Sequence, residues 1–403
     1  HHDAALVCMQ LSQADEAERL LRHAIDLAPQ RARLWSDLAN LLRVTRRNTD
    51  AVVAAHRTLE LDPDDKLAEL TLAHALADLG ESDQALEHSV RALEKAHDDS
   101  EFTSAVGELY ENWKLIAPAM DVYRRALAIN PERTRIAARL LDLTLSACDW
   151  SDYDNLVARQ IAAVTDAIDN AATSDIDVFN LQALPVSYEF TTRAAAKAAT
   201  AIAATARNGG ANAPFVHTAR RRTKIRLGYA LAYTWFHSLP LVLKDIVGRH
   251  DRDRFEVFGY SALTCTGTDF SREYRAAFDR FADIPVMAPR DAANIIHNDE
   301  IDVLIDVTGL TSINCMAVSS LRPAPVQVHA YGYSISTGAD YIDYLLTDRT
   351  YIPPECEALG PEKLIYMPHT FMPTRGLVPV DGGARRAEFD LPEEGIVFCN
   401  STT

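Results

Sequence analysis

The spacing of hydrophobic residues changes near residue 223. Before that point, apolar side chains recur three or four positions apart, which is the period of a buried helix face. After it, they gather into short runs rich in Val, Ile, Leu and Tyr, which are typical of buried strands. These runs are KIRLGYA (224–230), FEVFGYSA (255–262), DVLIDVT (302–308), VQVHAYGY (326–333), DYLLTD (343–348) and EKLIYMP (362–368). The pattern therefore predicts a helical first part and a second part that contains a sheet.

The helical part is repetitive, with a period of about 34 residues. Four similar segments, AIDLAP, TLELDP, ALEKAH and ALAINP, end at equal intervals along the chain, at Pro29, Pro63, His97 and Pro131. Alanine recurs with the same step, at Ala17, Ala51, Ala85 and Ala119. Small alanines let paired helices approach closely, and proline ends the second helix of a pair. This period predicts a tetratricopeptide array over residues 1–147.

The repeat register also predicts what surrounds the array. Ala5 and Cys8 lie one period before Ala39 and Leu42, so the chain is expected to begin inside the first helix of a repeat. Because the open face of a stacked repeat normally needs a neighbour or a cap, we expect further repeats before residue 1. Such arrays bind extended peptides on a concave face, so the predicted partner of this part is a protein.

The second part is predicted to be an α/β lobe over residues 223–395, behind a helical spacer over 148–222. Helical segments separate most of the strands, at 239–250, 270–279, 290–298 and 314–320. Alternating strands and helices predict a parallel sheet covered on both faces. No G-x-G-x-x-G motif follows a strand, which argues against a dinucleotide-dependent oxidoreductase. Residues 396–403 are expected to start a further lobe that is missing from this chain.

Two loops at predicted strand ends carry unusual side chains. The first follows KIRLGYA and contains Tyr233, Thr234, Trp235, Phe236 and His237. The second, YGYSISTGADY (331–341), is rich in glycine and hydroxyl residues, so its backbone amides could approach a phosphate or a sugar. Ligands of open α/β sheets bind at the carboxyl ends of the strands. Both loops are therefore candidate parts of a binding site.

Composition narrows the class of protein. The formal charge of −17 argues against a nucleic-acid partner. None of the six cysteines pairs with another at C-x-x-C spacing, which argues against a zinc site or a redox motif. Scattered single cysteines favour a reducing compartment, and we expect the cytoplasm. No run of about 18 apolar residues exists, so no transmembrane helix is expected.

Several stretches, taken together, resemble the SPINDLY-like O-linked N-acetylglucosamine transferase family. They occur in family order behind the repeats: ACDWSDYD (147–154), KIRLGY with His237, HDRDRFEVFGYS (250–261), IHNDEIDVLIDVTGLT (296–311), LRPAPVQV (321–328), GYSISTGADYIDYLLTD (332–348), EKLIYMPHTF (362–371) and LPEEGIVFCN (391–400). The resemblance implies a tetratricopeptide solenoid followed by the Rossmann-like N-terminal lobe of a GT-B glycosyltransferase. In this family most contacts to UDP come from the C-terminal lobe, so this chain alone is expected to have little or no transferase activity.

The resemblance also implies a reaction. Family members transfer a sugar, here expected to be N-acetylglucosamine from UDP-GlcNAc, to Ser or Thr of proteins, with inversion and without a metal or other cofactor. The negative charge on the departing diphosphate must then be neutralised, and the proton of the acceptor hydroxyl must be removed. The expected partners are acceptor proteins held by the repeats and the nucleotide sugar.

Candidate site residues follow from the same resemblance. His237 matches the family's active-site histidine, for which we favour a positioning role over that of a literal base. The donor loop corresponds to Gly332, Tyr333, Ser336, Thr337 and Gly338, and a cleft-lining position to Thr308 and Gly309. Asp306 and His369 are interpreted as structural.

Departures from the family pattern keep two other functions open. Ser334 and Ile335 stand where the family has proline and glycine, and the β-branched Ile335 is expected to resist a positive φ. Tyr233, Ser238 and Arg280 also differ from the usual residues. The first alternative is a transferase of this family with another nucleotide sugar, for example in bacterial surface-protein or flagellin glycosylation. The second is a non-catalytic tetratricopeptide scaffold that binds proteins.

Overall fold

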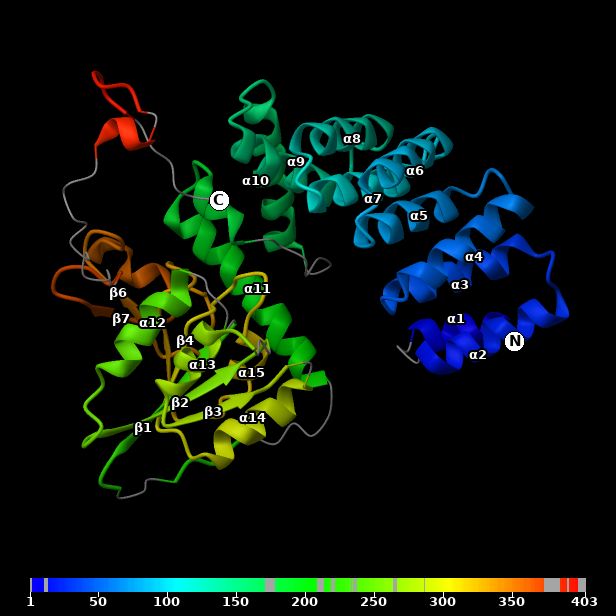
Figure 1. The fold of residues 1–403 in the computed structure, drawn as a ribbon. Helices are drawn as coiled ribbons and strands as arrows, with labels where there is room; N and C mark the ends of the chain where they lie inside the picture. Colours follow the sequence, from blue (N-terminus) through cyan, green and yellow to red (C-terminus); the bar gives the residue numbers. More distant parts are fainter. Residues whose placement is uncertain are drawn as a thin grey trace. The chain divides into compact units, whose positions relative to one another are not determined.

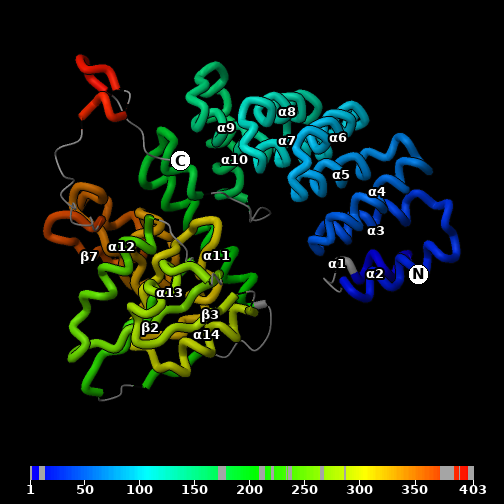
Figure 2. Tube along the Cα trace, in the orientation of Figure 1, coloured from blue at the N-terminus to red at the C-terminus, as the bar shows by residue number. Residues whose placement is uncertain are grey.

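The computed structural model describes residues 2–10, 14–170, 178–208, 214–218, 222–232, 234, 238–263, 267–285, 287–372, 385–389 and 391–397. Its contacts divide the chain into two compact units, His1–Asp169 and Asn170–Thr403. Each unit is described by itself below. Figure 1 labels their helices and strands, and Figure 2 follows the same chain as a tube.

The first unit consists of paired antiparallel helices with the predicted repeat. Its helices are α1 (His2–Gln10), α2 (Ala14–Leu27), α3 (Ala32–Val44), α4 (Asn48–Leu61), α5 (Lys66–Asp78), α6 (Ser82–Lys95), α7 (Ser100–Asn112), α8 (Ile116–Ile129), α9 (Thr134–Ala147) and α10 (Tyr153–Asp169). From α3 to α9, the first helices of successive pairs begin one period apart, at Ala32, Lys66, Ser100 and Thr134. The predicted tetratricopeptide fold is therefore confirmed.

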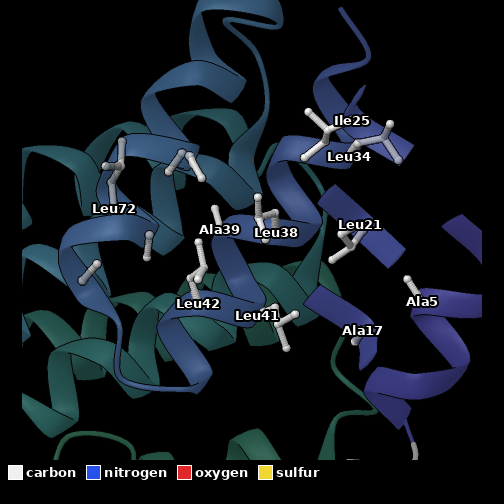
Figure 3. Packing of buried hydrophobic residues seen from close by; sticks show 14 of the residues in the cluster. Ala5, Ala17, Leu21, Ile25, Leu34, Leu38, Ala39, Leu41, Leu42 and Leu72 are labelled. Carbon is white, nitrogen blue, oxygen red and sulfur yellow. The ribbon is translucent and has the colours of Figure 1, made fainter. Parts of the chain in front are cut away.

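Small residues let the helices of a pair pack closely. Ala51 on α4 and Ala39 on α3 have no exposed surface, and Figure 3 shows Ala39 between Leu38 and Leu42, with Leu72 on a neighbouring helix. One repeat uses glycine instead. A Cβ atom at Gly107 would lie 2.6 Å from the ring of Tyr123, so only glycine lets α7 and α8 approach this closely.

The two parts of the predicted spacer belong to different units. Helix α10 packs on α9 at the end of the repeats. The 3₁₀ helix η1 (Asn180–Ala183) and the long helix α11 (Tyr188–Asn208) belong to the second unit, where α11 packs on α15 (Met316–Ser319) and η2 (Pro354–Leu359). Helix α11 is therefore part of the α/β unit, covering one side of it, although its alanine-rich sequence resembles a linker.

The second unit is a seven-stranded sheet in which every strand pairs in parallel. Its strands are β1 (Ile225–Leu231), β2 (Phe255–Ser261), β3 (Arg280–Asp283), β4 (Val303–Asp306), β5 (Val326–His329), β6 (Tyr344–Thr347) and β7 (Lys363–Tyr366). Their spatial order is β3-β2-β1-β4-β5-β6-β7, so chain order reverses between β1 and β4. The predicted Rossmann-like sheet is confirmed.

Helices cover both faces of this sheet. Helices α12 (Ser238–Gly248) and α13 (Asp269–Ala276) share a core with Leu227, Tyr229 and Leu231 of β1. Helix α14 (Pro289–Asn298) shares the other core with Ala230 and Leu304. This alternation along β1 places successive side chains on opposite faces, as strand geometry requires.

The structure adds one strand that the sequence pattern misses. Strand β3 has only four residues, begins with Arg280 and ends with Asp283, and lies at an edge of the sheet. A short edge strand buries few side chains, so it leaves no apolar run in the sequence. At the other end of the chain, residues 391–397 form no strand, and 398–403 lie outside the described residues. No helix among the described residues is long and apolar enough to cross a membrane.

Candidate functional site

The carboxyl ends of β1, β4 and β5 lie at one edge of the sheet, the edge at which open α/β sheets bind their ligands. Chain order reverses between β1 and β4, and in open α/β folds such a reversal is where ligand sites typically occur. The loop after β1 contains His237, which lies outside the described residues together with Tyr233, Trp235 and Phe236. Helix α12 begins at the next residue, Ser238. The role of His237 stays a prediction.

Asp306 builds the turn after β4. It is buried, and its Oδ1 accepts hydrogen bonds from the Thr308 amide at 2.7 Å, the Thr308 hydroxyl at 2.6 Å and the Gly309 amide at 3.0 Å. Ser319 of α15 donates to the other carboxylate oxygen at 3.3 Å. With both oxygens engaged inside the protein, Asp306 acts as a structural residue here, in keeping with its interpretation from sequence.

Thr308 and Gly309 are both enclosed by this turn. The Thr308 hydroxyl donates to Asp306 and accepts a hydrogen bond from the Cys315 amide at 2.9 Å. Gly309 has a φ of 52°, and a Cβ atom there would lie 2.4 Å from Cβ of Tyr333. The loop after β4 therefore touches the predicted donor loop at this glycine.

His329, the last residue of β5, joins the same two loops. Its Nδ1 lies 3.0 Å from the Asp306 carbonyl oxygen, and its Nε2 contacts the carbonyl oxygen of Tyr333. The ring is fully buried. Sequence reasoning did not single out His329, although a histidine at the carboxyl end of a predicted strand is a signal that could have done so.

The first half of the predicted donor loop packs against β4. A Cβ atom at Gly332 would lie 2.1 Å from the Val307 carbonyl oxygen, so this position requires glycine. In this half of the loop Tyr331 has a positive φ, of 74°, and Ile335 is not among the described residues with positive φ. The expected conflict at Ile335 therefore does not arise, because the turn occurs four residues earlier and Ile335 packs in the interior.

The second half of the loop is held by a buried carboxylate. Glu362, directly before β7, accepts hydrogen bonds from the Ser336 hydroxyl at 2.6 Å, the Thr337 hydroxyl at 2.6 Å and the Thr337 amide at 2.7 Å. Gly338 has a φ of 63°, and a Cβ atom there would lie 2.3 Å from the Ala196 nitrogen of α11. Sequence reasoning missed Glu362, because no residue near it in the sequence indicates that it binds Ser336 and Thr337, which come much earlier in the chain.

The structure thus divides the predicted site residues into two groups. Thr308, Gly309, Gly332 and Tyr333 come together around His329, at the carboxyl edge of the sheet. Ser336, Thr337 and Gly338 contact Glu362 and α11 instead. In the second group both hydroxyl groups already hydrogen-bond to Glu362, so these residues shape the loop. A direct contact between them and a ligand stays a prediction.

A cavity of about 360 Å³ opens beside the same edge. Its walls follow three strands: Ala262 comes after β2, Ile284 after β3, and Ser312, Asn314 and Cys315 after β4. Burial raises the pKa of the Cys315 thiol, so this group stays protonated near neutral pH and is a poor nucleophile. The mixed apolar and polar lining suits a sugar ring or a small side chain. Among the described residues, no three His, Cys, Asp or Glu side chains are grouped so that they could hold a metal ion.

Comparisons with known proteins agree with this architecture. The model of glycosyl transferase family 41 matches residues 147–374. The chain is 26% identical over 273 residues to a probable UDP-N-acetylglucosamine–peptide N-acetylglucosaminyltransferase, SEC, of Arabidopsis thaliana, covering 64% of this chain and 28% of that protein. It is 31% identical over 230 residues to the UDP-N-acetylglucosamine–peptide N-acetylglucosaminyltransferase of Caenorhabditis elegans, covering 56% of this chain and 20% of that protein.

A solved structure shares the fold. A mutant of the O-GlcNAc transferase of Thermobaculum terrenum superposes with a TM-score of 0.53 at 19% identity, over 88% of this chain and 60% of that chain. At this identity the likeness concerns the fold alone. The chain spans less than a third of the length of the two curated relatives described above.

Proposed function

Because the chain belongs to glycosyl transferase family 41, we propose that it forms the acceptor-selecting repeats and the N-terminal catalytic lobe of a protein O-glycosyltransferase. The donor is UDP-GlcNAc, and the acceptor is a Ser or Thr hydroxyl of a protein. The acceptor oxygen bonds to the anomeric carbon from the face opposite UDP, and the proton of the acceptor hydroxyl passes to water. The bond from that carbon to the diphosphate oxygen breaks, and UDP leaves with the bonding pair.

The family match over residues 147–374 carries this proposal. Two further observations support it. Both curated relatives described above are named as peptide N-acetylglucosaminyltransferases that use UDP-N-acetylglucosamine. The parallel sheet also presents two loops and a cavity at its carboxyl edge, where ligands of such sheets bind.

The residues take the following parts in the proposed reaction. His237, between the end of β1 and the start of α12, orients the acceptor hydroxyl or the sugar by hydrogen bonds. Gly332 and Tyr333 approach the donor through their backbone, since Gly332 has no side chain and Tyr333 is buried. Ser336, Thr337 and Gly338 hold that backbone in place through Glu362 and α11. The reaction needs no metal in this proposal.

An intact-mass assay tests the proposal. The full product of the natural gene is incubated with candidate acceptor proteins and UDP-GlcNAc, and the acceptors are weighed by mass spectrometry. The expected result is an increment of one N-acetylhexosamine per modified hydroxyl, absent when UDP-GlcNAc is left out. An unchanged acceptor mass with every nucleotide sugar offered would reject the transferase and favour a protein-binding scaffold.

A second candidate is a transferase of the same family with a different nucleotide sugar. Two features of the donor loop favour this second candidate. Ser334 and Ile335 replace the usual proline and glycine, and Tyr331 has a positive φ. Competition separates the two candidates. UDP-GlcNAc, UDP-glucose and GDP-fucose are offered in an equimolar mixture, and the mass added to the acceptor identifies the sugar that is used.

A further inference from the structure

The repeat array contains a half-buried arginine with an unusual set of neighbours. Helices α3 and α5 are the first helices of consecutive repeats, and they pack side by side. Asn40 on α3 and His74 on α5 occupy the same position in these two repeats. Arg43 follows Asn40 by one helical turn, so the three side chains belong to one patch of the array.

Arg43 differs from most arginines of the array in its partners. Arg46 pairs with Asp78 at 2.9 Å, and Arg47 pairs with Glu18 at 2.7 Å and with Asp50 at 2.6 Å. Arg43 instead donates a 3.0 Å hydrogen bond to Oδ1 of Asn40, a neutral group. Within the described ranges, no carboxylate oxygen lies within 4 Å of its guanidinium.

Burying the Arg43 guanidinium without a carboxylate partner lowers the stability of the folded chain. Burial lowers the pKa of Arg43, and the nearby charge of Asp78 offsets only part of that effect. A guanidinium withdrawn from water usually gains a carboxylate partner in return, because an unpaired buried charge destabilises the fold. Asp78 does not fill this place, since its Oδ2 is held by Arg46 at 2.9 Å and by Asn48 at 3.1 Å.

His74 and Asn40 add hydrogen-bond donors to this patch, and the charge of Asp78 acts on His74 as it does on Arg43. Burial and, to a smaller extent, the charge of Arg43 lower the pKa of His74 to about 4 against the opposing charge of Asp78, so the imidazole is neutral at pH 7. A neutral imidazole still has one N–H group to donate. The amide nitrogen of Asn40 is a second donor, because its oxygen is the acceptor for Arg43. Arg43 keeps most of its five N–H groups available.

We propose that Arg43, Asn40 and His74 form a binding site for the carboxylate of an Asp or Glu side chain in a peptide bound to the repeats. Arg43 pairs with the carboxylate, and Asn40 and His74 donate to its oxygens. The site makes the array selective for acidic segments of its protein partners. The inference rests on the proposed role of the repeats in selecting acceptors, and it adds a chemical preference to that role.

Peptide selection on the 403-residue chain tests the site without any sugar transfer. A phage-displayed library of random linear peptides is panned on the immobilised chain, and the selected peptides are synthesised with amidated C-termini. The expected peptides share an Asp or Glu at one position. Replacing that residue by Asn or Gln should weaken binding roughly 10- to 100-fold, as measured by fluorescence anisotropy.

Variants tie that preference to Arg43. In Arg43→Met the acidic peptide and its amide counterpart should bind equally weakly. Arg43→Lys should keep part of the preference for the acidic peptide, because lysine retains the positive charge but lacks the planar guanidinium with its paired N–H donors. Arg57→Met is the matched control: Arg57 lies on α4 and pairs with Glu60 on the same helix, so this variant should bind as the parent does. Circular dichroism at equal protein concentration confirms that each variant is folded.

Three outcomes would overturn the site. Selected peptides could lack a shared acidic residue, Arg43→Met could retain the preference, or amidation of the C-terminus could itself abolish binding. The last result would assign the patch to a terminal carboxylate. The failure of the transferase proposal is distinguishable from all three, because peptide binding is read without a nucleotide sugar.

Discussion

The carboxylate of Glu362 accepts hydrogen bonds from both the hydroxyl and the amide of Thr337, although 25 residues separate them in the chain. Both residues are buried. This pair anchors the loop after β5 to the residue before β7, and Ser336 joins it through the other carboxylate oxygen. The loop expected to face the donor is thus held by a residue next to β7, two strands away from β5 in the sheet.

Glu362→Gln should destabilise the second unit by about 2–3 kcal/mol, because an amide has one oxygen to accept with where the carboxylate has two. At least one of the three donors from Ser336 and Thr337 then faces an NH₂ group. Hydrogen exchange of peptides from 225–366, followed over increasing urea, measures the loss.

Glu357→Gln is the control for this change. Glu357 lies on η2, five residues earlier, and it is exposed. An exposed carboxylate contributes little to stability, so this variant should unfold with the parent. Equal stability of Glu362→Gln and Glu357→Gln would contradict the assigned role of Glu362.

Gly309→Ala should separate the loops that meet at the carboxyl edge of the sheet. The added Cβ atom would lie 2.4 Å from Cβ of Tyr333, and the φ of 52° is unfavourable for alanine. Together these effects should cost about 2–3 kcal/mol in the free energy of unfolding. The matched control is Gly248→Ala, at the end of α12, where a Cβ atom meets no neighbour within 4 Å. Exchange in peptides covering 307–313 and 330–336 should rise in the first variant only.

Acid should weaken the repeat array through His74. Its pKa is about 4 in the folded chain because of burial and, secondarily, the charge of Arg43, whereas an unfolded histidine titrates near 6.5. Between these values the unfolded chain binds more protons, so stability falls as pH decreases from 6.5 toward 4. From pH 7 to pH 5 this one group should cost about 2 kcal/mol.

Comparison with His74→Gln isolates that contribution, because glutamine does not titrate. Urea unfolding of the repeats, read from exchange of peptides in 32–147, is measured for both proteins at pH 7 and pH 5. The parent should lose about 2 kcal/mol more than the variant. Equal losses would place the pH dependence on other groups, such as carboxylates.

Chelation should leave transfer unchanged if the proposed metal-free reaction is correct. The full natural protein is treated with excess EDTA, desalted and assayed by acceptor mass as above. The expected rate equals that of the untreated enzyme. A lost rate that Mg²⁺ or Mn²⁺ restores would show that a metal takes part in neutralising the diphosphate.

The features that could be predicted from sequence are those determined by residues close to one another in the chain. The repeat period fixes where helices begin, because each repeat carries its own small residues and helix end. Six of the seven strands leave apolar runs, and β3 leaves none because it is short and lies at an edge. What could not be predicted depends on contacts distant in sequence. Nothing in the sequence around Glu362 indicates that it binds Thr337, and nothing around Gly332 indicates that it packs against Val307 beside the positive φ of Tyr331.

His237→Ala should reduce transfer by the full natural protein about 10²- to 10⁴-fold, the range typical of a lost proton-transfer or positioning group. The resemblance assigns His237 to the active site, and in the sequence it follows β1, at whose carboxyl end open α/β sheets bind ligands. Initial rates over a range of donor and acceptor concentrations separate the two roles. Loss of positioning raises the KM for one substrate and lowers kcat, whereas loss of a base also removes the acidic limb of the kcat–pH profile.

Ser238→Ala is the control for His237→Ala, because it alters the next residue without removing an imidazole. It should retain a rate within a few-fold of the parent. His237→Asn and His237→Gln extend the test, since amides donate and accept hydrogen bonds but do not take up protons near neutrality. Partial rescue by either amide assigns His237 to positioning, and no rescue assigns it to proton transfer. A folded His237→Ala protein with near-normal turnover would remove His237 from the mechanism.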